Sequence, residues 1–133
     1  MKLISIATTL FLTIILSSTA IAESGEDGDG VQYIPLSPAI ITNYQSPQLR
    51  YVKAEITLQV SGTPTAQAIE RHLPYIRHNL VMLFSRQEEE NLSTPEGKSQ
   101  LKEDSLEAIV ATLESEGEPA EVEAILFTSF IVE

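Results

Sequence analysis

Residues 120–132 read AEVEAILFTSFIV, and this apolar run at the end of the chain decides the fold. Successive side chains of a strand point to opposite faces. One face would carry Val122, Ala124, Leu126, Thr128, Phe130 and Val132. The other face is also largely apolar, through Ile125, Phe127 and Ile131. Because a strand that is apolar on both faces is covered on both, we expect this one inside a sheet. Removing the last six residues should then unfold the domain.

A second strand is predicted at residues 50–60, RYVKAEITLQV, where apolar and polar residues alternate. This alternation is typical of a half-buried strand with one solvated face. We expect it to lie beside residues 120–132. Residues 31–44 are also apolar, but Pro35 and Pro38 cannot donate to a strand ladder. That stretch is therefore predicted to be an edge strand or extended chain, with a bend between the prolines, followed by a turn at 43–48.

Two helices are predicted between the strands. Residues 64–88 carry apolar side chains at steps of four and three, which indicates an amphipathic helix. Thr63 is its expected N-cap, and Pro74 should kink or split it. A second helix begins either at a Ser93–Glu96 capping box or with Thr94 as the cap, and it ends near Gly117. The element order predicts an α+β domain, with a small antiparallel or mixed sheet and two helices packed on one face.

The first 22 residues differ from the rest of the chain. Lys2 precedes an apolar run of about 14 residues, shorter than the roughly 20 that span a bilayer. The run leads to Ala20-Ile21-Ala22, which is typical of a cleaved secretory signal. We predict a signal peptide at 1–22, with an uncleaved membrane anchor as the alternative. Residues 23–30, ESGEDGDG, are predicted to be an acidic flexible linker rather than a metal loop, and 31–133 form one domain outside the cytoplasm.

Composition excludes several function classes. The chain has 8 basic and 19 acidic residues and a net charge of −11, which argues against nucleic-acid binding. With no Cys, thiol catalysis and cysteine metal sites are excluded. His72 and His78 are six residues apart, about 600° around a helix, so they do not share the one face that a zinc pair needs. Glu88-Glu89-Glu90 fits a solvated helix end. We predict no catalytic, cofactor or metal site, and the partner interface stays unassigned.

Several segments, in order along the chain, resemble the bacterial FliL family of flagellar basal-body-associated proteins. These segments are YIPLSPAIITNY (33–44), LRYVKAEITLQV (49–60), LPYIRHNLVMLFS (73–85), LSTPEGKSQLKEDSL (92–106) and VEAILFTSFIVE (122–133). The most telling pieces are Pro74-x-Ile76-Arg77, Thr94-Pro95-Glu96-Gly97-Lys98, and Phe127-Thr128-x-Phe130. From the residues alone, we expect Arg77 to pair with an acid such as Glu70 or to cap a helix end.

The resemblance implies a periplasmic domain similar to the stomatin/SPFH core, at the inner membrane and flagellar basal body. It implies a non-enzymatic protein that contacts stator or basal-body components, forms a homo-oligomer and supports motility, swarming and chemotaxis. Two features depart from the family pattern. Family members usually carry a full transmembrane helix, so cleavage after Ala22 would favour a soluble paralogue. His78 stands where many members have an acid. The alternative function is a periplasmic binding or adaptor module unrelated to the flagellum.

Overall fold

The structure, a computed structural model, describes residues 30–133. The signal peptide or anchor predicted at 1–22 and almost all of the predicted linker at 23–30 lie outside the described residues. The elements, in chain order, are β1 (Val31–Pro35), β2 (Ile40–Asn43), β3 (Tyr51–Ser61), α1 (Thr63–Arg71), α2 (Leu73–Ser85), α3 (Glu89–Ser93), α4 (Pro95–Ser115) and β4 (Val122–Val132). The predicted α+β class is confirmed.

The sheet is antiparallel and is built around β3. β1 and β2 pair with successive parts of β3, through Val31↔Ser61 to Pro35↔Thr57 and Ile40↔Ala54 to Asn43↔Tyr51. β4 pairs with β3 over almost its whole length, and these two strands are neighbours as predicted. The expectation that the last strand lies inside the sheet is wrong, because β4 pairs only with β3 among the described strands. The central strand is β3, and β4 forms an edge.

Two irregularities in β4 explain why its sequence is apolar on two apparent faces. The register between β3 and β4 shifts between Glu55 and Ile56, and again between Gln59 and Val60. Each shift inserts one extra residue into β4, as in a β-bulge, and reverses the alternation beyond it. The side chains on the helix side are therefore Val122, Ile125, Phe127, Phe130 and Val132, while Leu126 and Ile131 are exposed on the other side. A strictly alternating strand would have placed Phe127 and Phe130 on opposite faces.

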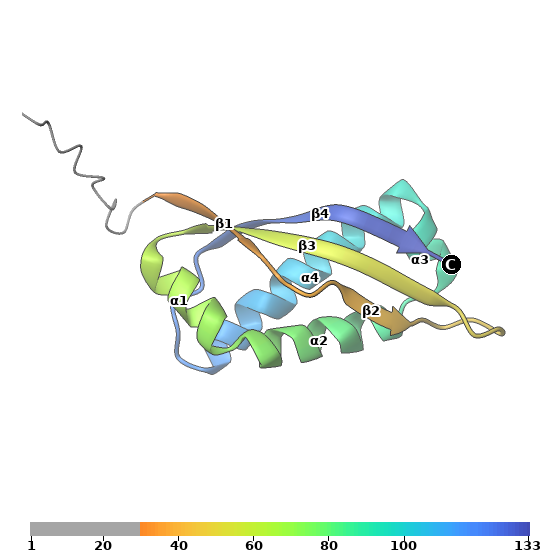
Figure 1. The fold of residues 1–133 in the computed structure, drawn as a ribbon, viewed down its shortest axis with the longest axis horizontal. Helices are drawn as coiled ribbons and strands as arrows, with labels where there is room; N and C mark the ends of the chain where they lie inside the picture. Colours follow the sequence, from red (N-terminus) through yellow and green to blue (C-terminus); the bar gives the residue numbers. More distant parts are fainter. Residues whose placement is uncertain (1–29) are drawn as a thin grey trace, which may run out of the picture.

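The helices form a layer on one side of the sheet, and Figure 1 shows the strands in front of α4. The five apolar residues of β3 that face this layer, Val52, Ala54, Ile56, Leu58 and Val60, are at most 2% exposed. The core is completed by Ile69 of α1, Ile76, Leu80 and Phe84 of α2, Leu92 of α3, and Leu101, Ile109 and Leu113 of α4.

The predicted long helix at 64–88 is two helices in the structure, α1 and α2. The helix is interrupted at His72, between α1 and α2. Pro74 lies in the first turn of α2, so the predicted split is confirmed. α2 ends at Ser85, and the acidic run starts the short helix α3 instead of fraying. The expected Thr63 cap is also wrong. Gly62 holds the cap position with φ 83°, a conformation that favours glycine, and makes no side-chain cap.

The start of α4 agrees with one of the two predicted caps. The Thr94 hydroxyl accepts a hydrogen bond from the Gly97 N–H at 3.1 Å, and Pro95 occupies the first turn. The helix ends at Ser115. Gly117, two residues beyond, has φ 70°, and the Glu118 N–H after it donates to the Leu113 carbonyl. This is the glycine-dependent helix end that the sequence predicts.

Candidate functional site

The two histidines lie apart and in different surroundings. His72 sits at the junction of α1 and α2, and its Nε2 lies 3.0 Å from Glu118 Oε1. His78 is exposed on α2. Within residues 30–133 there is no group of three or more His, Asp or Glu side chains that could hold a metal ion. The structure therefore does not bring the histidines together.

Glu118 joins the α4–β4 turn to the α1–α2 junction. Arg71 donates from Nη2 and Nε to the two carboxylate oxygens of Glu118, at 2.8 and 3.2 Å. The pKa of Glu118 is lowered, first by the Arg71 hydrogen bond and then by His72. No local sequence pattern indicates this contact, because the partners are 46 or 47 positions apart.

Arg77 does not pair with Glu70 or cap a helix end, so the expectation for it is wrong. Its guanidinium reaches from α2 to the segment between β1 and β2, where it donates to the carbonyls of Leu36, Pro38 and Ala39. Backbone carbonyls of a strand connection have no partners in the sheet, and a planar fork of donors can satisfy several of them. Arg77 is thus a clamp on this connection.

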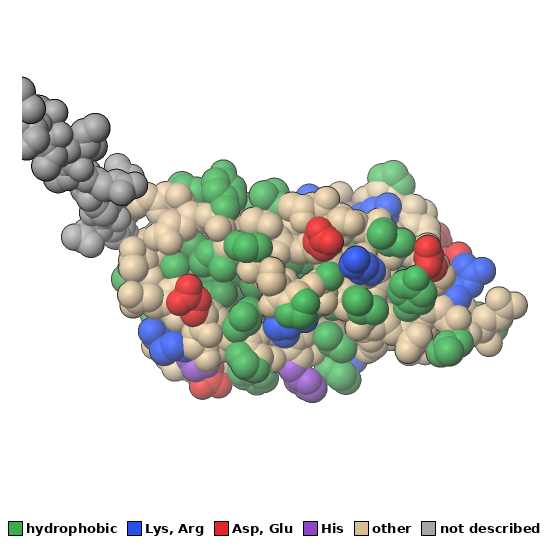
Figure 2. Space-filling model, viewed as in Figure 1, with side chains coloured by type: hydrophobic (Ala, Val, Ile, Leu, Met, Phe, Trp, Pro, Cys, Tyr) green, Lys and Arg blue, Asp and Glu red, His purple; other side chains and the backbone are tan. Residues whose placement is uncertain are grey.

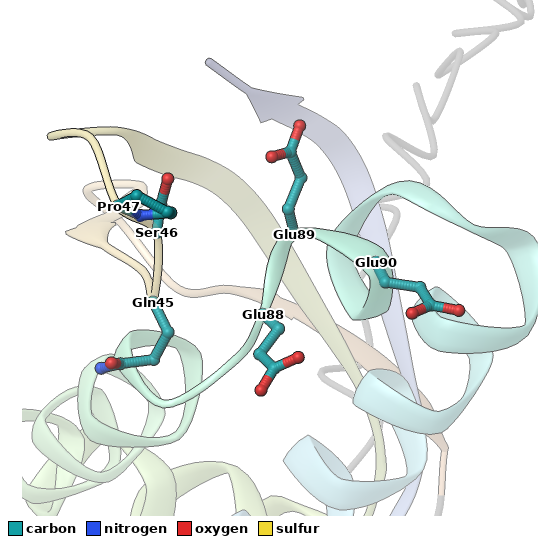
Figure 3. Close-up of a pocket in the computed structure, with 6 residues that line it drawn as sticks. All are labelled: Gln45, Ser46, Pro47, Glu88, Glu89 and Glu90. Atoms are coloured by element: carbon teal, nitrogen blue, oxygen red, sulfur yellow. The ribbon is translucent and has the colours of Figure 1, made fainter.

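The acidic run at Glu88–Glu90 lines a hollow of about 410 Å³, with Gln45, Ser46 and Pro47 on its opposite wall. Figure 3 shows the three carboxylates pointing in different directions rather than toward one point. Glu89 is paired with Arg50 at 3.3 Å. The arrangement is a solvated acidic rim and does not converge on a ligand.

The face of the sheet that carries no helix exposes several large apolar side chains. We call it the open sheet face, and its exposed apolar side chains are Val31, Tyr33, Ile41, Tyr51, Leu126 and Ile131. Six of the nine large apolar side chains that are exposed in the described region lie there, with exposures of 37–61%. Figure 2 views the molecule from this side and shows apolar side chains along the strands with few charged ones between them. Exposed apolar side chains gathered on one face are a feature of interaction surfaces.

Within residues 30–133, none of the helices combines the length and apolar character needed to cross a membrane.

Comparison with known proteins agrees with the resemblance. The model of the family described as "Flagellar basal body-associated protein FliL" matches residues 33–132. The chain is 32% identical over 105 residues to the "Flagellar protein FliL" of Aquifex aeolicus (strain VF5), covering 78% of this chain and 62% of that protein. It is 35% identical over 78 residues to the "Flagellar protein FliL" of Escherichia coli (strain K12), covering 58% and 50%. The chain thus aligns with about half to three fifths of the length of these relatives. Because the family match extends from β1 to the end of β4, this chain belongs to the FliL family of flagellar basal body-associated proteins.

Proposed function

We propose that this chain is a non-enzymatic accessory protein of the flagellar basal body, which supports motility, including swarming and chemotaxis, by contacting stator or other motor proteins. The family match over residues 33–132 carries the proposal. The open sheet face supports it physically, because an exposed apolar face on an otherwise acidic domain is suited to protein contacts. The proposal includes a domain like the stomatin/SPFH core that self-associates.

The domain is proposed to act in the periplasm at the inner membrane. Residues 1–22 support export, through their single Lys, apolar centre and Ala-x-Ala end. Measuring the intact mass of the protein recovered from a motile host tests this part. A mass beginning at Glu23 in the periplasmic fraction means a cleaved signal and docking from solution. A mass beginning at Met1 in the membrane fraction means an anchor and contradicts cleavage.

The function is tested by deleting the gene in its parent bacterium and measuring swimming and swarming. A fluorescent fusion of the full chain should gather at flagellar bases, and the deletion strain should lose motility that the full chain restores. The alternative, a periplasmic adaptor unrelated to the flagellum, predicts normal motility and a fusion spread around the cell. That result would contradict the proposal.

A further inference from the structure

The middle of the open sheet face holds one positive and one negative side chain. Lys53 and Glu55 are two apart on β3, so both point away from the helices. Lys53 lies between Ile41 on β2 and Ile131 on β4, which are its register partners on either side. The ion pairs of the described residues are Arg50–Glu89, Arg71–Glu118 and His72–Glu118, and they include neither Lys53 nor Glu55.

The charge of the chain restricts how two copies can approach each other. A net charge of −11 makes most orientations repulsive. At the centre of the open sheet face, however, the charges of Lys53 and Glu55 balance. If two copies stack face to face about a two-fold axis perpendicular to β3, passing midway between these residues, Lys53 of each copy lies over Glu55 of the other. A two-fold interface needs such a self-complementary surface.

The surface around Glu55 is also shaped to receive a side chain. A hollow of about 280 Å³ opens beside it, where the chain leaves β1 for β2, and the lining includes Pro35, Thr57 and Thr128. Glu55 is the only charged residue among those that line it. A Lys from an opposing copy could enter this hollow and meet the carboxylate.

We propose that the open sheet face is a two-fold interface between two copies of this chain, centred on reciprocal Lys53–Glu55 pairs and surrounded by Ile41, Leu126 and Ile131. The proposal names the surface for the self-association included in the proposed function, and it rests on that part of it. The neutral, self-complementary centre favours a second copy over a strongly charged partner. A basic partner would be repelled by Lys53, and an acidic partner would be repelled by Glu55.

The test is a charge exchange between two differently tagged full-length copies expressed in one cell. Two wild-type copies should co-purify. Lys53→Glu in both copies, or Glu55→Lys in both, should lower recovery about tenfold, because each change turns two attractive pairs into repulsive ones. One Lys53→Glu copy with one Glu55→Lys copy should restore recovery, because opposite charges again face each other across the axis. A defect in folding alone would not be rescued by mixing.

A matched apolar pair completes the test. Ile131 is 42% exposed on the open sheet face, and Met82 is 39% exposed on α2. Ile131→Ser should reduce recovery, whereas Met82→Ser should leave it unchanged, with the thermal melting of both variants confirming that they fold. This interface is overturned if two wild-type copies do not co-purify, or if neither charge reversal lowers their co-purification. If the fluorescent fusion still gathers at flagellar bases in that case, the proposed flagellar function is retained and only the interface is rejected.

Discussion

The Phe127 and Phe130 rings stack on the same side of β4, with centroids 5.3 Å apart and planes 19° apart, although they are three positions apart in a strand. The extra residue at the register shift, Thr128, makes this possible. Both rings also meet Phe84 of α2, at centroid distances of 6.0 and 6.4 Å. Lys98 of α4 lies over the Phe130 ring, 5.4 Å from its centroid. The bulged edge strand is thereby joined to two helices.

Truncating Phe127 should therefore cost much more stability than truncating the residue before it. Phe127→Ala removes the contacts with Phe84 and Phe130, and we expect a loss of about 2–3 kcal/mol in the free energy of unfolding. Leu126→Ala is the control, because Leu126 points to the open sheet face, and its effect should stay below about 0.5 kcal/mol. Urea unfolding of both variants at low concentration measures the difference. Equal losses would contradict the assigned register.

Removing residues 128–133 should leave a chain that does not fold. The deletion takes away the pairing of Val52 to Glu55 with β4 and the Phe130 ring. It also removes both backbone hydrogen bonds between Tyr51 and Glu133. Far-UV circular dichroism and proteolysis check the result. Deleting Glu133 alone is the control and should leave a folded domain, and a cooperative transition for the longer deletion would contradict the prediction.

Gly97→Ala should destabilise the protein even though alanine favours helices. A Cβ at this position would lie 2.4 Å from the Asn91 carbonyl oxygen and 2.6 Å from its Cα. These are backbone atoms of α3, so the start of α4 would have to move away. We expect a loss of about 1–3 kcal/mol in unfolding free energy. Ser99→Ala, exposed in the same helix, should be close to neutral, and a stabilising Gly97→Ala would show that α3 does not approach α4 this closely.

A lysine at position 77 should not preserve the stability that Arg77 provides. One ammonium group cannot donate to the separate carbonyls of Leu36, Pro38 and Ala39 as the guanidinium does. We expect both Arg77→Lys and Arg77→Ala to lower the unfolding free energy, by about 1–2 kcal/mol for the alanine variant. Hydrogen exchange should increase first between β1 and β2. Arg86→Ala provides the control, because Arg86 is exposed at the C-terminal end of the same helix.

Stability should depend on pH through Glu118. Because Arg71, and then His72, hold its pKa below the ordinary value of 4.5, the contact stabilises the folded state above that value. The contribution is lost as the pH falls through 4.5 toward the folded-state pKa. Glu118→Gln should lower the free energy of unfolding at pH 7. It should also reduce how steeply that free energy falls between pH 5 and 3, measured by urea unfolding. Glu114→Gln, which breaks none of the three ion pairs, should keep the wild-type slope.

Local signals determined the elements that depend on neighbouring residues. The alternation at residues 50–60 predicted β3, and Thr94-Pro95 predicted the start of α4, where the Thr94 hydroxyl accepts from Gly97. Pro74 predicted the break between α1 and α2. In each case the cause is the period of the side chains or a missing or capped backbone donor, and these act within a few residues.

The sequence by itself determined the α+β class, the pairing of the two long strands and the end of α4 at Gly117. The tertiary structure alone decided that β4 is an edge, which of its apolar side chains face the helices, that Arg77 clamps the β1–β2 connection, and that Arg71 and His72 hold Glu118. Those features depend on contacts between residues roughly 40 to 80 positions apart. The position of a bulge depends on how the strand pairs with its neighbour, and the alternation of side chains reverses beyond it. The apolar residues on two apparent faces of β4 therefore divide into a buried set and an exposed set.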